Sequence, residues 1–279
     1  MSTLYIVATP IGHLEDASHR SVRVLSEVDK VVAEDTRRTQ QLLSHYAIRT
    51  PLLSLHDWNE SARAPQVIQW LEQGQSVALV SDAGTPLISD PGFILVRMAR
   101  EKGLAVVPIP GPCALIAALS VAGLPTNQFV FEGFLPAKGE KRTQRLEALA
   151  HETRTLVLYE SCHRIAWLTE ELTSIFGPDR MVCLARELTK NFETVLFVTA
   201  ETLRTKIAED PMQRKGEFVV IVAGCQAQPE AQKVEGVRVL RVLMRSLSVK
   251  QSAQMAHEIT GIAKNLLYQW ALEQVAERD

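Results

Sequence analysis

The sequence lacks the features that would mark a membrane protein, a disulfide-bonded protein or a metalloprotein. No apolar stretch approaches the roughly 20 residues that a transmembrane helix requires. The cysteines are far apart and never form a CxxC pair, which predicts reduced thiols in a cytoplasmic protein and no metal site. They are Cys113, Cys162, Cys183 and Cys225. The N-terminal MSTLYIVATPIG carries no charged leader and is broken by proline and glycine, which predicts a first strand and not a signal peptide.

The chain also has no excess of charge of either sign. Its formal net charge is −2, so charge balance alone does not indicate a nucleic-acid partner, and any basic surface must be local. Hydrophobic residues make up 46% of the 279 residues and charged residues 22%. This composition is usual for globular proteins, and the length allows two domains with separate cores.

The common phosphate-binding and hydrolytic motifs are absent as well. None of the 14 glycines forms a GxG pair, and there is no GxxxxGK[ST] loop. The sequence contains neither GxSxG nor HExxH. The chain is therefore not predicted to be an ordinary dehydrogenase, NTPase or hydrolase.

What the sequence does contain is an alternation of short apolar runs with amphipathic helical patterns. This alternation is typical of α/β proteins with mainly parallel sheets. Strands are predicted at 4–8, 31–33, 51–55, 77–80, 105–109, 156–159, 181–185, 193–198 and 218–222. We expect an α/β domain at 1–136, a second α/β domain at 137–226 and a helical extension at 233–279.

The end of the chain has no strand pattern. The segment QAQPEAQ at 226–232 is predicted to be a linker. Three short helices are expected after it, the last two joined across Thr260-Gly261. These two helices resemble a helix-turn-helix, although two packed amphipathic helices would give the same pattern.

Three loops at predicted strand ends carry unusual residues, and ligands of open parallel sheets bind at such ends. They are Thr9 to Gly12, Ser81 to Gly92 and Pro110 to Pro112. Gly84 would let the backbone approach a ligand closely. Pro112 is expected in the first turn of a helix whose free amides, at Cys113 and Ala114, suit a carboxylate. The alternatives are a turn-rich connection, with Ser89 and Asp90 capping a helix that begins at Pro91, and a helix that merely starts with proline.

Segments around these loops resemble a known family. They are YIVATPIGHLED, AEDTRRT, LHDWNE, ALVSDAGTPLISDPG, VVPIPGPCALIAALSVAGLP, FEGFLPAKG, LVLYESCHR, LARELTK and RKGEFVVIV, in order over nearly the whole chain. With them the sequence is similar to the tetrapyrrole methylase superfamily, the class III S-adenosylmethionine-dependent methyltransferases, and within it to the branch that methylates small-subunit ribosomal RNA. The resemblance implies two α/β domains with the methyl donor in the cleft between them.

Carried over by position, the resemblance implies a donor site that draws on both halves of the chain. The implied residues are Pro10, Ser81, Asp82, Gly84, Thr85, Pro86, Leu87, Cys113, Ala114, Tyr159, Glu160, Ala185, Glu217 and Phe218. Two positions depart from small-molecule members, which have Gly-Asp-Pro where this chain has Ser81-Asp82-Ala83, and serine or threonine where it has Cys113. Both loops contact the donor mostly through backbone, so the binding role is expected to persist.

The resemblance also implies the reaction, which is 2′-O-methylation of a cytidine in the decoding region of 16S rRNA. It implies S-adenosylmethionine as methyl donor without a metal, the small ribosomal subunit as partner, no membrane, and a cytoplasmic homodimer. Transfer from the activated sulfonium needs in-line positioning and loss of the hydroxyl proton. Asp35, His56 and Glu60 follow strands and are candidates for the base, with a helix cap, an ion pair, or water as proton acceptor as alternatives.

Several basic residues are candidates for phosphate contacts, with solvated helix surface as the alternative. They are Arg37, Arg38, Lys138, Lys141, Arg142 and Arg145. Two other functions stay open: a methyltransferase of the same superfamily that acts on a small tetrapyrrole or a protein side chain, and a non-catalytic ribosome-binding protein of the same fold.

Overall fold

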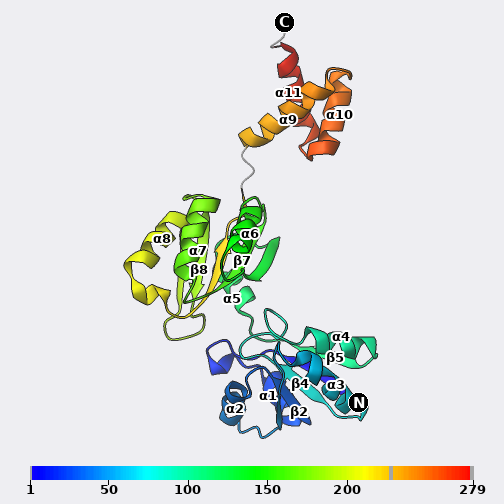
Figure 1. The fold of residues 1–279 in the computed structure, drawn as a ribbon, viewed down its shortest axis with the longest axis vertical. Coiled ribbons are helices and arrows are strands. Elements are labelled where there is room, and N and C mark those ends of the chain that lie inside the picture. The colour runs from blue at the N-terminus through cyan, green and yellow to red at the C-terminus, as the bar shows by residue number, and fades with distance from the viewer. Residues whose placement is uncertain (1, 226–228, 277–279) are drawn as a thin grey trace. The chain divides into compact units, whose positions relative to one another are not determined.

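The computed structural model describes residues 2–225 and 229–276 and divides the chain into two compact units, Met1–Gly224 and Cys225–Asp279. The first unit contains two five-stranded sheets, and the described residues of the second form helices and their connections (Figure 1). No helix in these described ranges is both long and apolar enough to span a bilayer.

The first sheet is entirely parallel, as the sequence predicted, with strand order β3-β2-β4-β1-β5. Its strands are β1 (Thr3–Val7), β2 (Lys30–Ala33), β3 (Leu52–Ser54), β4 (Val77–Val80) and β5 (Ala105–Ile109). Its helices are α1 (His19–Glu27), α2 (Thr36–His45), α3 (Glu60–Glu72) and α4 (Phe93–Glu101), after a 3-10 turn η1 (Leu14–Asp16). Helices α1 and α2 cover one face of this sheet while α3 and α4 cover the other, so the inner strands β2 and β4 are buried on both faces.

The second sheet differs from the expectation of mainly parallel strands. Its order is β6-β7-β10-β8-β9, and only the β6–β7 pair is parallel. The strands are β6 (Phe129–Phe134), β7 (Thr155–Ser161), β8 (Met181–Arg186), β9 (Thr194–Thr199) and β10 (Glu217–Val222). The connection from β8 to β9 contains no helix, and so short a connection can join only antiparallel neighbours.

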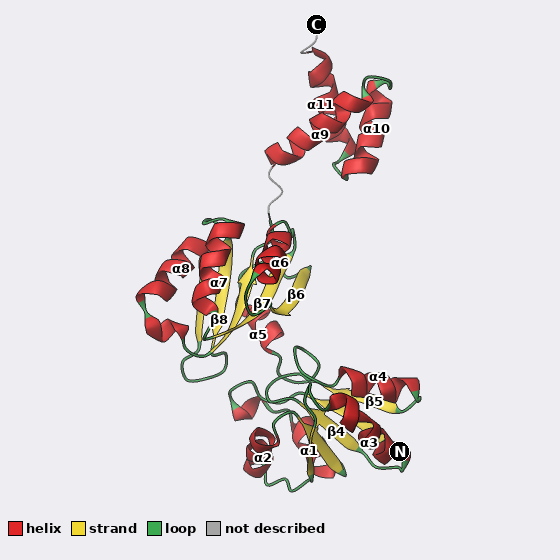
Figure 2. Ribbon diagram, in the orientation of Figure 1, coloured by secondary structure: helices red, strands yellow, loops and turns green. Residues whose placement is uncertain are grey.

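Helices also lie on both faces of the second sheet (Figure 2). One face carries α6 (Glu140–Ala150), α7 (Ile165–Glu171) with its π-helical continuation η2 (Leu172–Phe176), and α8 (Ala200–Glu209). The other face carries α5 (Ala114–Val121). A 3-10 turn, η3 (Pro211–Arg214), precedes β10.

Two elements lie in the second sheet although the sequence placed them in the first domain. The strand β6 pairs with β7, and α5 packs on β10 through Leu115 and Ala118. Both elements precede residue 136, where we expected the first domain to end. The predicted domain limits remain predictions, but the change of sheet occurs between β5 and β6.

The helix α4 begins at Phe93, two residues after the predicted start at Pro91. Its N-cap is Gly92, with φ of +127°, and Ser89 has φ of +68°. A Cβ at Gly92 would lie 2.6 Å from Leu79 Cδ2, so the backbone conformation before the helix leaves room only for glycine. Asp90 is therefore not the cap of this helix.

The second unit is a bundle of α9 (Pro229–Leu243), α10 (Val249–Thr260) and α11 (Lys264–Ala276). Its core consists of Val239, Leu240, Ala253, Ala256, Ile262, Leu267 and Ala271. Gly261 ends α10 in the left-handed conformation, with φ of +69°, so the predicted junction of the last two helices is confirmed. Of the predicted linker, 226–228 lie outside the described residues, whereas 229–232 belong to α9, since proline is favoured in a first helical turn.

Candidate functional site

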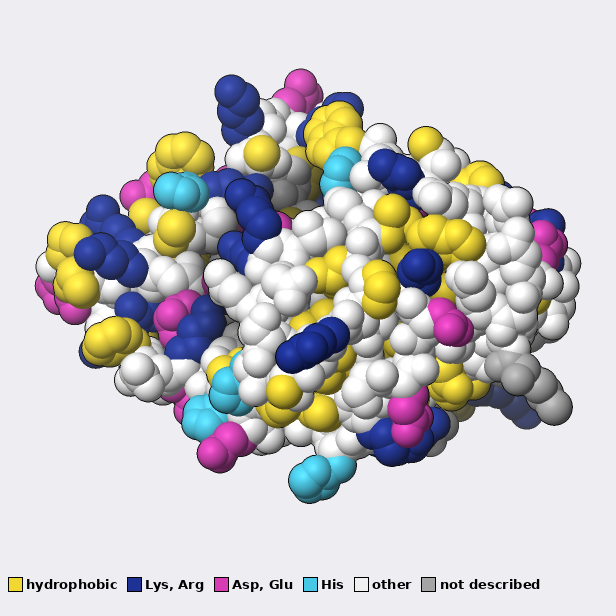
Figure 3. All heavy atoms as spheres, turned by 90° about the horizontal axis from the view of Figure 1, so that it is seen from below, with side chains coloured by type: hydrophobic (Ala, Val, Ile, Leu, Met, Phe, Trp, Pro, Cys, Tyr) yellow, Lys and Arg dark blue, Asp and Glu magenta, His cyan; other side chains and the backbone are white. Residues whose placement is uncertain are grey.

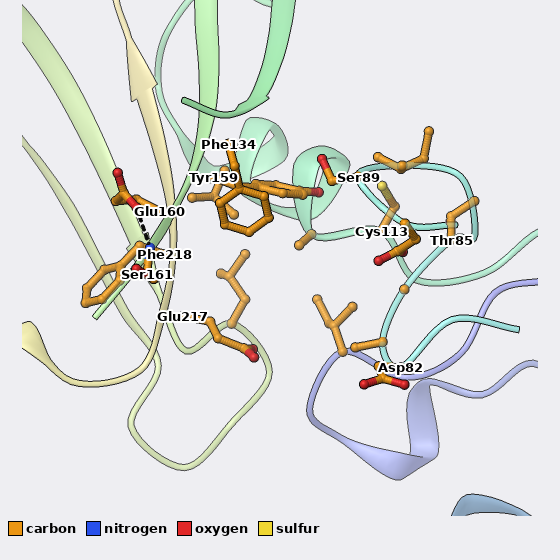
Figure 4. Close-up of a pocket in the computed structure, with 18 of the residues that line it drawn as sticks. Asp82, Thr85, Ser89, Cys113, Phe134, Tyr159, Glu160, Ser161, Glu217 and Phe218 are labelled. Carbon is orange, nitrogen blue, oxygen red and sulfur yellow. Dashed lines mark hydrogen bonds between the residues drawn. The ribbon is translucent and has the colours of Figure 1, made fainter. Parts of the chain in front are cut away.

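A pocket of about 440 Å³ lies between the two sheets of the first unit. Its walls come from segments that follow strands of the first sheet, from the start of α5, from β6, β7, β8 and β10 of the second sheet, and from the loop after β8. Figure 4 shows Asp82, Thr85 and Cys113 on one side, and Phe134, Tyr159 and Glu217 on the other. The volume is within the usual range for a small-molecule site.

Most of the residues that the resemblance implied are gathered around this pocket. Those that line it are Asp82, Gly84, Thr85, Cys113, Ala114, Tyr159, Glu160, Ala185, Glu217 and Phe218. Pro10, Ser81, Pro86 and Leu87 are not among the lining residues. Ser81 is buried, and its hydroxyl donates to the carbonyls of Ala83 and Gly84, so it stabilises the conformation of the loop.

The loop after β4 is held to its neighbours by reciprocal backbone hydrogen bonds. The amide of Thr9 donates to the Gly84 carbonyl and the amide of Gly84 donates to the Thr9 carbonyl, each at 2.9 Å. Thr85 Oγ1 donates to the Pro112 carbonyl at 3.0 Å. Gly84 has φ of +86°, and Leu87 adopts +73° without being glycine. Such backbone strain is characteristic of ligand-binding loops, where surrounding contacts maintain it.

One end of the pocket is acidic, because Glu34, Asp82 and Asp90 line it together. Asp82 Oδ1 accepts from the Asp35 amide at 2.9 Å, and its Oδ2 lies 3.4 Å from Arg38 Nη1. Burial, followed by the charge of Glu34, raises the pKa of Asp90 to about 7. Burial and the charge of Asp82 likewise raise the pKa of Glu34. A cationic ligand would stabilise the ionised forms of both groups.

The start of α5 is only partly open to a ligand. Cys113 is the N-cap and Ala114 the first helical residue, so Pro112 precedes the cap and is not in the first turn as predicted. The Leu115 amide donates to the Tyr159 hydroxyl at 3.1 Å, which removes one of the free helix amides. Burial raises the pKa of Tyr159, so its hydroxyl stays protonated.

Glu160 lines the pocket, but its carboxylate is used inside the protein. Its two oxygens lie 3.2 Å from Arg142 Nη2 and 2.8 Å from Arg164 Nε, and the side chain is fully buried. Its Oε1 also accepts from the Ser161 amide at 2.7 Å, the bond dashed in Figure 4. A contribution of Glu160 to ligand binding would therefore come from its backbone.

The same ion pairs correct one prediction about RNA. Arg142 is 3% exposed and also pairs with Glu171 at 2.8 Å, so it is not available to a phosphate. Arg145 pairs with Glu132 but remains half exposed. Lys138 and Lys141 are exposed. On the face in Figure 3, Lys and Arg side chains are scattered among acidic and hydrophobic ones.

Two loops meet at another part of the pocket wall. Lys190 Nζ lies 2.8 Å from Glu217 Oε2 and 2.9 Å from Glu187 Oε1. The amide of His13 donates to Thr189 Oγ1 at 3.1 Å, and a Cβ at Gly12 would lie 2.5 Å from Lys190 Cγ. The loops after β1 and β8 therefore pack closely only because residue 12 is glycine.

None of the three predicted base candidates is among the residues that line the pocket. Asp35 caps α2, and its hydrogen bonds from Arg37 lower its pKa to about 2. Glu60 is buried and accepts from the Leu95 amide at 3.0 Å, in the first turn of α4. His56 Nε2 lies 3.0 Å from Asn59 Nδ2. Asp35 thus caps a helix, as the sequence had offered as an alternative, and Glu60 binds the first turn of another helix, whereas the His56 ring contacts the side chain of Asn59. A catalytic role for any of the three stays a prediction.

The sequence reasoning missed several lining residues, among them Ile11, Asp90, Phe134, Leu188 and Lys190. Asp90 was overlooked because the pattern Ser-Asp-Pro matches a helix cap. Phe134 was taken as the end of the first half, although its segment FEGFLPAKG belongs to the family resemblance. Leu188 and Lys190 lie in LARELTK, which also belongs to the family resemblance, but nothing in that segment marked them as pocket residues, because they reach the pocket through the packing of their loop. In residues 2–225 and 229–276, no group of three or more metal-binding side chains is arranged to hold an ion.

Comparison with known proteins agrees with these features. Residues 3–204 match the family Tetrapyrrole (Corrin/Porphyrin) Methylases, and residues 230–274 match the RsmI C-terminal HTH domain. The chain is 56% identical over 266 residues to Ribosomal RNA small subunit methyltransferase I of Xylella fastidiosa strain Temecula1, which covers 95% of this chain and 97% of that protein. It is 52% identical over 274 residues to the protein of that name in Pseudomonas aeruginosa, with 97% of each covered.

Solved structures share the fold at low sequence identity. The uroporphyrin-III C-methyltransferase from Thermus thermophilus, complexed with S-adenyl homocysteine, has a TM-score of 0.56 and 17% identity, covering 79% of this chain and 97% of that one. A diphthine synthase has a TM-score of 0.62 and 15% identity, covering 80% and 90%. The two-sheet architecture therefore recurs in enzymes whose sequences have diverged widely.

Proposed function

Because the chain belongs to the ribosomal RNA small subunit methyltransferase I family of tetrapyrrole methylases, we propose that it methylates the 2′ hydroxyl of a cytidine in the decoding region of 16S rRNA. The methyl donor is S-adenosylmethionine, and no metal takes part. The observation that carries the proposal is the near full-length identity of 56% to a relative of that name. The pocket between the two sheets is the proposed donor site.

The charges of this pocket suit the donor. S-adenosylmethionine carries a sulfonium and an ammonium group, and the carboxyl groups of Glu34, Asp82 and Asp90 gather at one end of the pocket. Its carboxylate fits the amides at the start of α5, where Cys113 and Ala114 line the wall. When bound, the donor supplies a methyl group that is already activated.

The work left to the protein is to position the ribose hydroxyl in line with the methyl group and to let its proton leave. Asp35 is a poor base, because its pKa of about 2 leaves it little affinity for a proton at neutral pH. The Glu60 carboxylate already accepts from the Leu95 amide of α4, and His56 is not among the residues that line the pocket. We therefore propose that positioning supplies most of the rate enhancement and that water accepts the proton.

The test is methylation of small ribosomal subunits, and separately of naked 16S rRNA, with donor labelled in the methyl group. The nucleoside products are then separated. The expected product is a cytidine methylated on ribose, which protects its 3′ phosphate from alkaline cleavage. Label on a base would exclude ribose methylation, and label in protein or in added tetrapyrrole would favour the alternative substrates. Donor binding without any transfer to these substrates would favour the non-catalytic ribosome-binding protein.

We further propose that the enzyme works in the cytoplasm as a homodimer. The face of the second sheet that carries α5 is only partly covered, since Phe197 of β9 is 50% exposed beside buried Cys183. Ile116 of α5, on the same side, is 56% exposed. Sedimentation equilibrium should give twice the mass of the chain, and Phe197→Asp should lower it. A monomer at micromolar concentration would contradict this proposal.

A further inference from the structure

The turn that follows β3 displays a tryptophan to solvent. Trp58 is 96% exposed, the largest exposed fraction among the exposed large hydrophobic residues of the described chain. The residues that flank the turn, Leu55 and Glu60, are both buried. An indole held outside the core in this way is a broad, flat surface that is available to a partner.

The turn that carries Trp58 is fixed by hydrogen bonds. Asn59 Oδ1 accepts from the His56 amide, and the His56 carbonyl accepts from the amides of Asn59 and Glu60, all at 2.9 Å. Asn59 Nδ2 also donates to the Ser54 carbonyl at 3.4 Å. The indole is therefore displayed on a fixed backbone, which reduces the entropy lost when a partner binds.

The same turn lies at the edge of the proposed donor pocket. Strands β2 and β3 are parallel neighbours, with Ala33 opposite Ser54, so the segments after them leave the same edge of the sheet. The Leu55 amide donates to the Ala33 carbonyl at 2.8 Å. Glu34, the next residue after β2, lines the pocket. The charge of Asp57, next to Trp58, contributes to the raised pKa of Asp90 at the acidic end.

Two arginines follow β2 at this edge. Arg38 lines the pocket and is 63% exposed, whereas Arg37 is 88% exposed. A shallow hollow beside them is lined by Thr36, Arg37, Gln40 and Leu52. The cationic groups thus extend from the pocket to the outer surface between α2 and β3. Exposed arginines contact phosphates without regard to sequence.

We infer that Trp58 is a stacking platform for an unpaired RNA base beside the target nucleotide, with Arg37 and Arg38 on the adjoining phosphates. The inference rests on the proposed function, because it takes RNA as the substrate. A ribose that enters a pocket must leave the regular stack of its strand. An aromatic face replaces the stacking that neighbouring bases lose, and it does so for any base, because every base has a π face.

The test compares Trp58→Ala and Trp58→Phe with Trp167→Ala, which removes an indole that is 57% exposed on α7. Trp58→Ala should raise the KM for RNA roughly tenfold, as expected for the loss of one base stack, with kcat and donor affinity nearly unchanged. Trp58→Phe should retain most of the wild-type affinity, and Trp167→Ala should behave as wild type. A KM for Trp58→Ala equal to that of wild type would overturn the inference.

A second readout does not depend on catalysis. The chain has four tryptophans, and the fluorescence difference between wild type and Trp58→Phe isolates the signal of Trp58. A short unstructured RNA oligonucleotide should quench this signal, and an unchanged signal at saturating oligonucleotide would contradict stacking. Weaker binding of Trp58→Ala to intact subunits alone, with oligonucleotide binding unchanged, would assign the indole to a ribosomal protein and overturn the inference. A wild-type protein that methylates no RNA would instead refute the proposed function. This outcome is distinct from one in which wild type methylates RNA and Trp58→Ala has no effect.

Discussion

At the scale of single residues, the pocket depends on a backbone conformation that favours glycine and on a carboxyl group whose pKa is far from its ordinary value. Gly84 has φ of +86° at the pocket wall, and Asp90 has a pKa of about 7. Both lie in the connection between β4 and α4, which also holds two non-glycine residues with positive φ, Leu87 and Ser89. The strain and the abnormal pKa thus coincide in one loop, as is common at functional sites.

The first prediction concerns Gly84→Val, with Gly74→Val as a matched control. Gly74 also has a positive φ, +92°, but a Cβ there meets nothing within 4 Å and lies away from the pocket. Both variants should lose stability by about 1–2 kcal/mol, because valine is strained in this region. Only Gly84→Val should weaken S-adenosylmethionine binding, by about tenfold or more, since it places a side chain in the pocket. Calorimetric titration measures the affinities, and equal affinities in the two folded variants would show that the donor binds elsewhere.

The second prediction concerns pH and Asp90. Its folded pKa of about 7 lies above the ordinary value of 3.8, so the folded protein holds more protons between these limits. The stability of the ligand-free protein should therefore fall as pH rises from about 4 to about 7. A cationic donor stabilises the ionised form of Asp90, so the affinity for the donor should rise with pH over the same window. Asp90→Asn should weaken both dependences, and what remains is expected from Glu34, whose pKa is also raised by burial. Thermal melts with and without donor measure both slopes, and a variant with the wild-type slopes would exclude Asp90 as the titrating group.

At the scale of elements, helix α6 is attached to the second sheet by ion pairs as well as by apolar contacts. Arg142 reaches Glu160 of β7 and Glu171 of α7, so one guanidinium joins three elements. The sequence KGEKRTQR gave no sign of this, because a buried arginine and an exposed one occupy the same helical pattern.

The third prediction follows from that ion pair. Arg142→Ala should destabilise the protein by about 3–5 kcal/mol, because it leaves a buried carboxylate without one of its partners. Arg145→Ala, on the same helix but half exposed, should cost less than about 1 kcal/mol. Urea denaturation distinguishes the two variants. Similar losses would mean that the Arg142 pair is screened by solvent.

At the scale of the whole molecule, the chain divides into a unit with the pocket and a unit of three helices. Leu240 is fully buried in the core of the helical unit, and Leu243 and Trp270 pack against that same core. These apolar residues are therefore accounted for within their own unit. These three side chains therefore give no reason to expect that removal of the helical unit exposes a large apolar surface.

The fourth prediction is the outcome of truncation after residue 225. The donor affinity should stay nearly unchanged, because every residue that lines the pocket precedes residue 220. The apparent affinity for RNA should fall and its salt dependence should become shallower, because Arg245, Lys250 and Lys264 are lost with the helices. Circular dichroism serves as the control for folding. A stable truncated protein with full affinity and rate on RNA would show that the helices do not recognise substrate.

Much of the fold could be predicted from local pattern. The strands Val77–Val80 and Ala105–Ile109 were predicted with the observed limits. Parallel strands between two layers of helices are continuous apolar runs, fully buried at β4 and partly exposed at the edge strand β5, so their limits are visible in the sequence. The direction of strand pairing in the second sheet could not be predicted from such runs, because it depends on which strands become neighbours. The same applies to β6, whose own sequence does not say which sheet it joins.

The sequence by itself determined the family, the two α/β halves and ten of the 22 residues that line the pocket, because glycines, prolines and strand ends are local features that persist in short motifs. Only the tertiary structure decided how each of those residues is used. In the structure, the Glu160 carboxylate pairs with Arg142 and Arg164, and Asp90 lines the pocket. The Glu60 carboxylate, at the start of α3, accepts from the Leu95 amide of α4. A carboxylate has the same sequence signature whether it caps a helix, pairs with a buried arginine or faces a ligand. Its burial and its partners distinguish these roles, and both come from segments far apart in the chain.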